Sequence, residues 1–277
     1  LPNGANPTSY EMLNYISDKG LTPEQFAKLN DFIGDNFNIE INDSYNNSVE
    51  VAELLVDDCM EYSTYTVTDR ALPSIDGFKP SQRRVLYSMY KQGLFHNKKR
   101  TKSANVSGEV MKLHPHGSTY STSARMARND SMNIPLLDGK GSFGLHGSQY
   151  IESASERYTE LRLGEIASHI FNGVDKGLVP MVDNYDNSQK EPALLPVELP
   201  LILINPTIGI AVGFSSNICG YNLKEVCYNT AKMMRGEQTS VLVPEFSTGA
   251  LIVNDENTFL KLHTTGTGTI RQRAKYH

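Results

Sequence analysis

The chain has 277 residues, of which 39% are hydrophobic and 21% are charged, as in an ordinary soluble globular protein. Its formal net charge of −5 argues against a uniformly basic nucleic-acid-binding protein, and no apolar run approaches the roughly 18 residues of a membrane span. The three cysteines lack CxxC spacing, which indicates buried thiols in a reducing compartment and gives no zinc site.

The charges are distributed unevenly along the chain. Residues 1–66 carry twelve Asp or Glu and two Lys, whereas residues 79–112 carry nine Lys or Arg against Glu109 alone. This asymmetry predicts a local anion-binding face. The alternative is a solvated basic helix and loop without a ligand, because basic clusters are common on protein surfaces.

The N-terminal part of the chain predicts an extension followed by helices. Residues 1–47 mix Asn, Asp, Gly and Pro with short amphipathic pieces, and we expect an N-terminal extension or a linker there. Residues 48–69 repeat apolar side chains at helical spacing and predict a long helix. A turn at residues 74–77 should separate it from a second helix that begins at Pro80 and ends at Gly93.

The second helix carries both apolar and basic side chains. Val85, Leu86 and Met89 have the spacing of residues that face a core. Arg83 and Arg84 carry fixed charges, which a core excludes, so we expect both side chains to project into solvent.

A shorter helix is expected over residues 105–113, with Val106, Val110 and Met111 facing inward. After it, the tight turn His114-Pro-His-Gly117 leads into another expected helix.

That following helix should cover residues 120–129, with Ser118 or Thr119 as its cap. Two helices joined by a sharp turn in a basic neighbourhood are typical of a helix-turn-helix, whose second helix enters the major groove of DNA. Many helical hairpins share this spacing, so the pattern alone does not establish DNA binding.

Glycines and prolines interrupt the rest of the chain. The glycine-rich loop of residues 138–144 is not a P-loop, because Gly141 follows Lys140 where Ser or Thr is needed, and this disfavours nucleotide binding. The other expected elements are a helix over 158–169, β structure from 192 to 213, a helix over 223–235, and strands at 250–253 and 267–273.

Six short motifs occur in a fixed order. They are Arg70–Pro73, Asp76–Tyr87, His114–Gly117, Asp138–Gly144, Arg157–Glu160 and Gly209–Gly213. Together they resemble type IIA DNA topoisomerases, most of all the A subunit of bacterial gyrase and topoisomerase IV. The resemblance covers roughly residues 48–277, and the altered intervals between motifs suggest a viral or phage member of the family.

The resemblance implies an α+β fold with two domains. A winged-helix (helix-turn-helix) DNA-binding domain with the catalytic tyrosine is expected over residues 48–165. The start of an α/β tower domain is expected over residues 166–277.

The resemblance also implies that Tyr158 is the catalytic nucleophile. It would attack a DNA phosphate and form a transient 5′-phosphotyrosyl link, allowing a second duplex to pass before resealing. A phenol is mostly protonated at neutral pH, because its ordinary pKa is about 10, so it needs cations near the phosphate. Arg157 supplies forked donors suited to phosphate, and Arg70, His116 and His114 match family residues of the same site. For each histidine the alternative is a turn residue bonded to backbone.

Further positions of the resemblance imply contacts with DNA. These positions are Lys79, Arg83, Arg84, Lys102, Ser118 and Ile210. Cations on the phosphate backbone position the duplex and make binding salt-dependent. Ile210 matches an isoleucine that wedges between base steps and bends the DNA, the alternative being an isoleucine of a core strand.

Cofactors and partners are implied by the resemblance as well. Glu109 alone cannot hold Mg²⁺, so Mg²⁺ and ATP are expected on a Toprim and ATPase module, either a B subunit or a fused upstream segment. Double-stranded DNA is the expected substrate, and a homodimer is expected because a duplex has two strands to cut. No targeting segment is visible, so we expect the protein in the cytoplasm, with the nucleoid or, if viral, in the host.

Two interpretations of function remain open. The first is the DNA breakage-reunion part of an ATP-hydrolysing type II topoisomerase. The alternative is a non-catalytic winged-helix DNA-binding module. Arg157 and Tyr158 discriminate between them, because a binding module needs neither a nucleophile nor a cation beside it.

Overall fold

The computed structural model describes residues 51–115, 119–145, 148 and 150–275, with the backbone alone for residues 51–58. The predicted extension at residues 1–47 and the predicted site residues His116 and Ser118 lie outside the described residues. The described residues from Asp57 onward belong to one compact unit.

The first described element is the helix α3 (Val51–Thr66), which continues as the π-helix η1 (Val67–Ala71). The long helix predicted over residues 48–69 is therefore confirmed where the structure describes it. The predicted turn at residues 74–77 is also confirmed, because the N–H of Gly77 donates to the carbonyl of Ser74. Gly77 has a φ of +85°, a left-handed conformation that favours glycine.

Helix α4 (Pro80–Lys91) forms as the sequence predicts. Pro80 occupies the first helical position, where the missing N–H of proline costs no hydrogen bond. The predicted apolar face, Val85, Leu86 and Met89, is fully buried.

Helices α5 (Ser103–Leu113) and α6 (Tyr120–Met126) match the two shorter predicted helices. Val106 and Val110 of α5 are buried as predicted. The predicted inward position of Met111 is wrong, because its side chain is 44% exposed. Met111 follows Val110 directly, so it lies about 100° further around the helix, away from the core.

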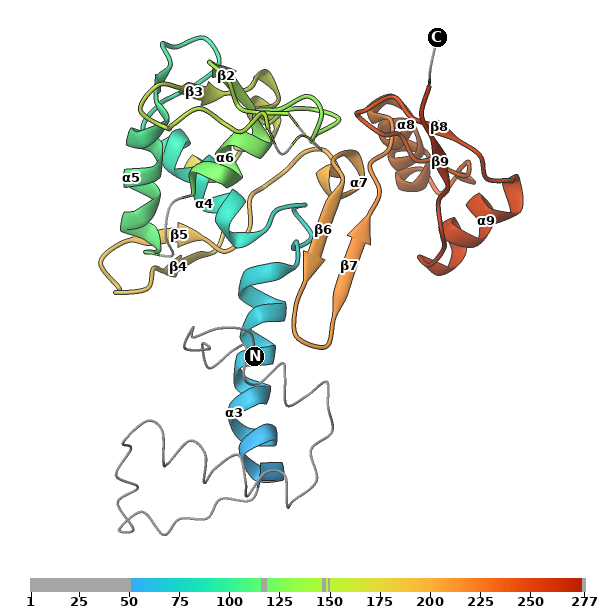
Figure 1. The fold of residues 1–277 in the computed structure, drawn as a ribbon, viewed down its shortest axis with the longest axis horizontal. Coiled ribbons are helices and arrows are strands. Elements are labelled where there is room, and N and C mark those ends of the chain that lie inside the picture. The colour runs from blue at the N-terminus through green and yellow to red at the C-terminus, as the bar shows by residue number, and fades with distance from the viewer. Residues whose placement is uncertain (1–50, 116–118, 146–147, 149, 276–277) are drawn as a thin grey trace, which may run out of the picture. The chain divides into compact units, whose positions relative to one another are not determined.

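Three short strands form an antiparallel sheet in the order β1-β3-β2. The strands are β1 (Thr101–Lys102), β2 (Leu137–Lys140) and β3 (Glu160–Leu163). Leu161 and Leu163 are fully buried, whereas Glu160 and Arg162 are partly exposed. Side chains of β3 therefore alternate between a core face, which packs against α4 and α5, and an outward face. The ribbon shows β2 and β3 above α4 and α6 (Figure 1).

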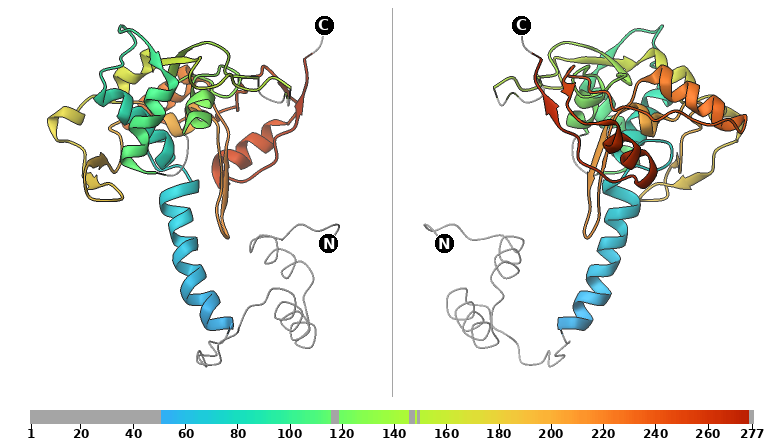
Figure 2. Two further views of the ribbon diagram at one scale, coloured as in Figure 1. Left: turned by 60° about the vertical axis from the view of Figure 1, so that its left-hand side comes forward. Right: turned by 90° about the vertical axis from the view of Figure 1, so that its right-hand side faces the viewer.

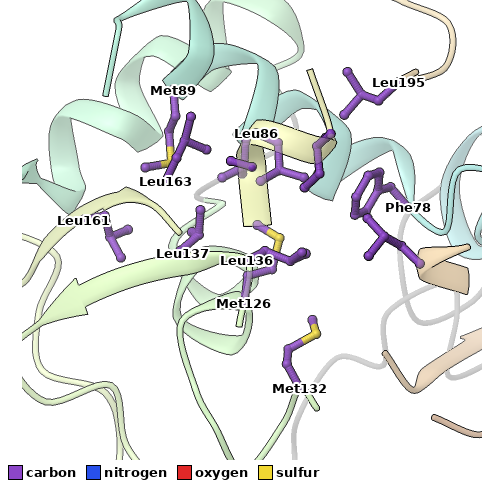
Figure 3. Close-up of a cluster of buried hydrophobic side chains, with 14 of the residues drawn as sticks. Phe78, Leu86, Met89, Met126, Met132, Leu136, Leu137, Leu161, Leu163 and Leu195 are labelled. Carbon is purple, nitrogen blue, oxygen red and sulfur yellow. The ribbon is translucent and has the colours of Figure 1, made fainter. Parts of the chain in front are cut away.

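The buried side chains of these helices and strands form one hydrophobic core (Figure 3). Leu163 of β3 lies beside Met89 of α4 in this core (Figure 3). The same cluster includes Leu195 and Val226, which come from the C-terminal half of the chain. Apolar packing therefore continues across residue 165, where the sequence predicts a domain boundary, and that boundary stays a prediction.

The C-terminal half contains mostly short elements. They are η2 (Glu165–His169), η3 (Val174–Lys176), β4 (Met181–Asp183), β5 (Lys190–Pro192), α7 (Leu201–Ile204), β6 (Thr207–Ile210), β7 (Ser215–Ile218), α8 (Leu223–Met234), β8 (Leu251–Ile252), α9 (Glu256–Thr265) and β9 (Gln272–Arg273). The strands pair antiparallel as β4–β5, β6–β7 and β8–β9. The hairpin of β6 and β7 extends away from the helices α4 and α6 (Figures 1 and 2).

Several predicted elements differ from the structure. The helix predicted over residues 158–169 is wrong, because residues 160–163 form β3 and residues 165–169 form the 3₁₀ helix η2. Thr119 stands at the N-cap position of α6, but its side chain makes no capping hydrogen bond.

Further differences lie near the C-terminus. Of the β structure predicted from residue 192 to 213, the hairpin strand β6 is confirmed, but residues 201–204 form the helix α7. The helix predicted over residues 223–235 is confirmed as α8. Between the two predicted strands that follow, the structure contains the unpredicted helix α9. None of the helices in the described part of the chain is both long and apolar enough to cross a membrane.

Candidate functional site

Tyr158 lies at the end of a surface turn formed by residues 155–158. Its backbone N–H donates to the carbonyl of Ser155 at 2.9 Å, and its side chain is 65% exposed. The guanidinium carbon of Arg157 lies 5.0 Å from the centre of the Tyr158 ring. The structure therefore brings the two predicted catalytic residues together, with a cation against the phenol ring and both side chains open to a large ligand.

Buried neighbours hold this turn in place. Thr159 is fully buried, and its hydroxyl lies 2.8 Å from the hydroxyl of Ser103 and donates to the phenol oxygen of Tyr120 at 3.1 Å. The carboxylate of Glu156 accepts a hydrogen bond from the hydroxyl of Ser107 at 2.8 Å. The turn is thus fixed to the N-terminal half of α5 and to α6, which positions Tyr158 without burying it.

A second group of predicted residues lines a pocket of about 470 Å³. The basic residues that line it are Arg70, Lys79, Arg84, His114 and Arg125. Among its described lining residues, Asp69 is the one carboxylate. The excess of positive charge suits an anionic ligand.

These basic residues come from four elements. Arg70 is exposed on η1 and donates to the phenol oxygen of Tyr62 at 3.3 Å. His114 follows α5 as its C-cap, and its ring meets the ring of Tyr185 edge-on, with 6.3 Å between centroids. The N-terminus of α4 supplies Lys79, and α6 supplies Arg125.

Lys79 is partly buried at the edge of the pocket. Its ammonium donates to the carbonyl of Ile208 at 2.6 Å. Partial burial, and then the charge of Arg125, lower the pKa of Lys79 below its usual value of 10.5. A phosphate in the pocket would counteract the second effect, because a nearby negative charge favours the charged ammonium.

The prediction that Arg83 projects into solvent is wrong. Its guanidinium is buried and donates to both carboxylate oxygens of Asp76, at 2.7 and 3.0 Å. Asp76 is only 2% exposed, and it also accepts from the N–H groups of Phe78 and Leu195. Such a pair is stable inside a protein because each charge neutralises the other and hydrogen bonds satisfy the remaining lone pairs. Arg83 therefore fixes the turn before α4 and does not present its charge to a ligand.

The prediction that Arg84 projects into solvent is only partly confirmed. It lines the pocket, but its side chain is only 20% exposed and its guanidinium donates to both oxygens of Glu191, at 2.8 and 2.9 Å. This ion pair ties α4 to β5. The charge of Arg84 is therefore largely balanced within the chain.

Two more predicted DNA-binding residues lie on strands outside the pocket. The ammonium of Lys102, on β1, lies 3.0 Å from the carboxylate of Glu160 and remains about half exposed. Ile210, at the end of β6, is 79% exposed. The alternative interpretation of Ile210 as a core residue is therefore wrong.

The structure does not bring all the predicted site residues to one place. Thr159, next to Tyr158, accepts a hydrogen bond from the backbone of Ser103 at the start of α5. The pocket is instead lined by Val110 and His114, at the end of α5. Helix α5 has 11 residues, so its two ends are about 15 Å apart. The pocket lining does not include Arg157 or Tyr158. The one site expected from the sequence is therefore two groups within a single chain.

The described residues do not fit a Mg²⁺ site. Among them, no group of three or more His, Cys, Asp or Glu side chains could hold a metal ion. Two residues after Tyr158, the carboxylate of Glu160 is engaged by Lys102. No catalytic step is therefore assigned to a metal held by these residues.

Sequence reasoning missed Arg125 as a site residue. Its side chain is exposed on α6, lines the pocket and acts electrostatically on Lys79. The signal was present in the sequence, because Arg125 lies in the second helix of the predicted helix-turn-helix, which is the helix that faces DNA in such a motif. Ser121 lines the same pocket.

The chain is similar in sequence to known proteins. The family described as the A subunit of DNA gyrase/topoisomerase IV matches residues 70–277. The chain is 39% identical to the DNA gyrase A subunit of Metamycoplasma arthritidis over 237 residues, which cover 82% of this chain and 26% of that protein. It is also 39% identical to the DNA gyrase A subunit of Thermotoga maritima, over 82% of this chain and 29% of that protein.

A relative named for topoisomerase IV is similar to the same degree. The A subunit of DNA topoisomerase 4 from Neisseria gonorrhoeae is 38% identical over 228 residues, covering 78% of this chain and 29% of that protein. The chain thus spans between a quarter and three tenths of the length of these relatives. Because the family match covers most of the chain and includes the Arg157–Tyr158 turn and the basic pocket, the chain belongs to the family of DNA gyrase and topoisomerase IV A subunits.

Proposed function

We propose that the chain is the DNA breakage-reunion part of an ATP-hydrolysing type II DNA topoisomerase, with Tyr158 as the nucleophile. The observation that carries the proposal is the exposed Tyr158 ring with Arg157 against it, on a turn anchored by buried Thr159. Family membership supplies the reaction class, since the matched relatives are named as subunits of DNA gyrase and DNA topoisomerase 4.

The reaction exchanges one phosphodiester bond for another. The phenol oxygen of Tyr158 attacks the phosphorus, a bond from this oxygen to phosphorus forms, and the bond from phosphorus to the 3′ oxygen breaks. The phenol releases one proton and the departing 3′ oxygen takes up one, so protons balance over the step. The protein remains linked to the 5′ end, and the reverse reaction reseals the strand. Arg157 stabilises the negative charge that develops around the phosphorus.

The finer fold assignment belongs to the same proposal. We assign α5 and α6 to a helix-turn-helix and the β1-β3-β2 sheet to the wing of a winged-helix domain. The exposed Arg125 on α6 supports this, because the second helix of such a motif faces DNA. We assign the residues after 165 to the start of a tower domain, with Ile210 on the projecting hairpin as a wedge between base steps.

The distance between the two groups of basic residues supports a site made by two chains. Within one chain the Tyr158 turn binds the start of α5, while the pocket with Arg70 and Lys79 lies at its end. In a homodimer, Tyr158 of one chain would meet the pocket of the other chain. Two such composite sites would serve the two strands of a duplex.

Mg²⁺ and ATP belong to other parts of the assembly in this proposal. When bound on a Toprim module, Mg²⁺ would neutralise charge on the phosphate, a task for which the described residues here offer no carboxylate cluster. An ATPase module would drive the passage of the second duplex. Both modules would come from a B subunit or from a fused segment, and the protein would act in the cytoplasm, where DNA is accessible.

One experiment tests this function. The full-length protein is mixed with its Toprim partner, Mg²⁺ and supercoiled DNA, and the mixture is then denatured with detergent. We expect protein linked to the DNA 5′ ends, lost in Tyr158→Phe and kept in Tyr150→Phe. Tyr150 is a suitable control because it is another exposed phenol, with a side chain that is 97% exposed.

The runner-up function is a non-catalytic winged-helix module that binds DNA. It predicts that the wild-type protein, Tyr158→Phe and Tyr150→Phe bind DNA equally, and that none of them becomes covalently linked to it. Equal linkage in wild type and Tyr158→Phe would refute the assignment of the nucleophile.

A further inference from the structure

Both ends of the turn that carries Tyr158 meet the hydroxyl of one side chain, Tyr120. The turn covers residues 155–158, so Ala154 precedes it and Thr159 follows it. The phenol O–H of Tyr120 donates to the carbonyl of Ala154 at 2.5 Å, and the phenol oxygen accepts from the hydroxyl of Thr159 at 3.1 Å. A single oxygen atom therefore connects the entry of the turn to its exit.

The hydroxyl of Ser103 extends this contact into a chain of three hydroxyls. It lies 2.8 Å from the hydroxyl oxygen of Thr159. A hydroxyl carries one proton, and that of Thr159 is donated to Tyr120, so Ser103 is the donor to Thr159. The chain then ends at the carbonyl of Ala154. Removal of the Tyr120 hydroxyl would take away the acceptor of Thr159 and the donor to Ala154, which is costly where polar groups are shielded from water.

The start of α5 also holds the backbone of the turn. The N–H of Ser103 donates to the carbonyl of Thr159 at 3.0 Å, and the N–H of Ala104 donates to the carbonyl of Glu156 at 3.2 Å. The first N–H groups of a helix have no acceptor within the helix, so the carbonyls of the turn satisfy them. Helix α5 thus fixes the backbone of the turn, and the side chain of Tyr120 joins its two ends.

Tyr120 connects the turn to the helix that carries Arg125. It is the first residue of α6, and its ring is partly buried with its centre 6.5 Å from that of Phe143. Met126, at the other end of α6, is fully buried in the core. The hydroxyl of Tyr120 is therefore presented to the turn from a helix that is itself fixed by core packing.

We propose that Tyr120 is a positioning residue for DNA cleavage, whose hydroxyl sets the position of the Tyr158 phenol relative to α6 and to the DNA that α6 faces. An exposed side chain needs such support, because the attacking oxygen must stand about 3–3.5 Å from the phosphorus and be aligned with the bond that breaks. A misplacement of about 1 Å can slow such a reaction about 100-fold. Tyr120 acts through the turn and does not contact the phosphate. This inference rests on the proposed function.

The first test removes the hydroxyl and keeps the ring. Tyr120→Phe takes one oxygen from the chain and leaves the packing against Phe143. The matched control is Tyr90→Phe, because Tyr90 is also partly buried and its hydroxyl donates to the carboxylate of Asp175, outside the Tyr158 turn. Both variants lose one hydrogen-bonded phenol hydroxyl, so a general loss of stability affects both.

Two quantities are measured on the full-length proteins with their Toprim partner. They are the single-turnover rate of covalent linkage at saturating DNA with Mg²⁺, and the affinity for the same duplex without Mg²⁺. We expect Tyr120→Phe to form the link about 10- to 100-fold more slowly, with DNA affinity within about twofold of wild type, because a positioning residue acts on the reaction and not on binding. Tyr90→Phe should match the wild type in both.

Variants of Thr159 test whether the hydroxyl chain acts as a unit. Thr159→Val removes the hydroxyl at nearly constant size and should slow linkage as Tyr120→Phe does. Thr159→Ser keeps the hydroxyl and should retain most of the rate. A protein with both Tyr120→Phe and Thr159→Val should be no slower than the slower single variant, because both changes break the same chain.

Hydrogen exchange reports the position of the turn without any reaction on DNA. The amide of Tyr158 donates to the carbonyl of Ser155, and the amide of Ala104 donates to that of Glu156. Both amides should exchange faster in Tyr120→Phe than in wild type, because the turn opens more often when its ends are not joined. Exchange at these amides should be unchanged in Tyr90→Phe.

Several results would overturn the proposal. Wild-type linkage rates in Tyr120→Phe would show that its hydroxyl is dispensable, and equal slowing in Tyr90→Phe would show a general effect of stability. Weaker DNA binding with an unchanged rate at saturation would make Tyr120 a binding residue. Independent, multiplying effects of Tyr120→Phe and Thr159→Val would also contradict a single chain. The proposed function fails separately: if the wild-type protein forms no covalent link, the nucleophile is refuted, and unchanged or faster amide exchange in Tyr120→Phe still decides whether Tyr120 holds the turn.

Discussion

At the scale of single residues, the geometry of the candidate site is set by buried side chains that do not themselves contact a ligand. Tyr158 is exposed, and its position is set by Thr159, whose buried hydroxyl links the turn to Ser103 and Tyr120. Lys79 is positioned by the turn before α4, which Asp76 holds through hydrogen bonds to backbone and to Arg83. Buried polar groups of this kind specify a geometry because an unpaired one is costly.

The pair of Asp76 and Arg83 gives the first prediction. Asp76→Asn should lower the free energy of unfolding by about 3–5 kcal/mol, because it leaves the guanidinium of Arg83 buried without a counter-charge. Urea denaturation measures the change. Asp183→Asn is the control, since Asp183 pairs with Lys190 at the surface and its loss should cost less than about 1 kcal/mol. Equal costs for the two variants would contradict the structural role of Asp76.

At the scale of elements, strand β6 of the hairpin packs closely against the end of η1, next to Arg70. A Cβ on Gly209 would lie 2.6 Å from the carbonyl oxygen of Ala71 and 2.7 Å from a methyl of Leu72. The residue that follows Arg70 is thus in close contact with the strand. Any side chain at position 209 must push the two elements apart.

The second prediction follows from this close approach. Gly209→Ala should lower the free energy of unfolding by about 1–3 kcal/mol through overpacking, and should reduce covalent linkage to DNA by displacing Arg70. Gly108→Ala, in α5, is the matched control, because the added Cβ would meet no atom within 4 Å beyond its chain neighbours and the backbone of its own helix. It should raise the free energy of unfolding by up to about 1 kcal/mol, since alanine favours helix. Destabilisation of both variants alike would count against this account.

The sheet gives a prediction about pH. Asp138 has a pKa below its ordinary value of 3.8 in the folded chain, because Arg100 and Arg162 outweigh the effect of burial. A depressed pKa means that its charge stabilises the fold above pH 3.8, and that this stability is lost as the pH falls through the folded value. Asp138→Asn should therefore be less stable than wild type near neutral pH, with the difference shrinking as the pH falls below about 4.

Urea midpoints of the two proteins, measured over a series of pH values, check this. A stability difference that stays constant down to pH about 2 would show that the Asp138 charge contributes nothing.

The elements that the sequence predicts well are those fixed by local pattern. Helix α4 follows from Pro80 at its start and from apolar spacing at Val85 and Met89, all within one segment. The sequence predicts a helix in place of strand β3, because Leu161 and Leu163 reveal their role only through the pairing of β3 with β1 and β2, which are distant in sequence. Apolar content alone does not separate a short strand from a helix.

The same distinction applies to the candidate site. The Arg157–Tyr158 pair is local, so its motif predicts it. Arg83 is buried against Asp76, whose carboxylate also accepts a hydrogen bond from the backbone of Leu195. Leu195 is more than a hundred residues away in sequence, and no local pattern reports that contact. Charged residues in a helix usually project, and this general tendency gave the wrong position for Arg83.

At the scale of the whole molecule, the separation of the Tyr158 turn from the Arg70 pocket leads to a prediction about dimers. Mixed dimers are formed from a Tyr158→Phe chain and an Arg70→Ala chain. If each site combines two chains, one site keeps both residues, and the mixed dimer should nick one DNA strand. If each site lies within a chain, both sites are defective and nicking is lost.

A matched control reverses the expectation. The control dimer pairs a wild-type chain with a chain that carries both Tyr158→Phe and Arg70→Ala. If each site combines two chains, this dimer has no intact site. If each site lies within one chain, it has one intact site. Nicking by this control dimer, without nicking by the mixed dimer, would contradict the two-chain site. Single-strand breaks in a supercoiled plasmid, counted after detergent and protease treatment, provide the measurement.

The most direct test of the central claim identifies the residue that carries the DNA. The full-length protein is trapped on DNA by detergent with its Toprim partner and Mg²⁺, digested with protease and nuclease, and analysed by mass spectrometry. The account predicts a nucleotide on the peptide that contains Arg157 and Tyr158, joined through a 5′ phosphate to the Tyr158 phenol. A link to another residue, a link through a 3′ phosphate, or DNA binding without any covalent link would contradict it.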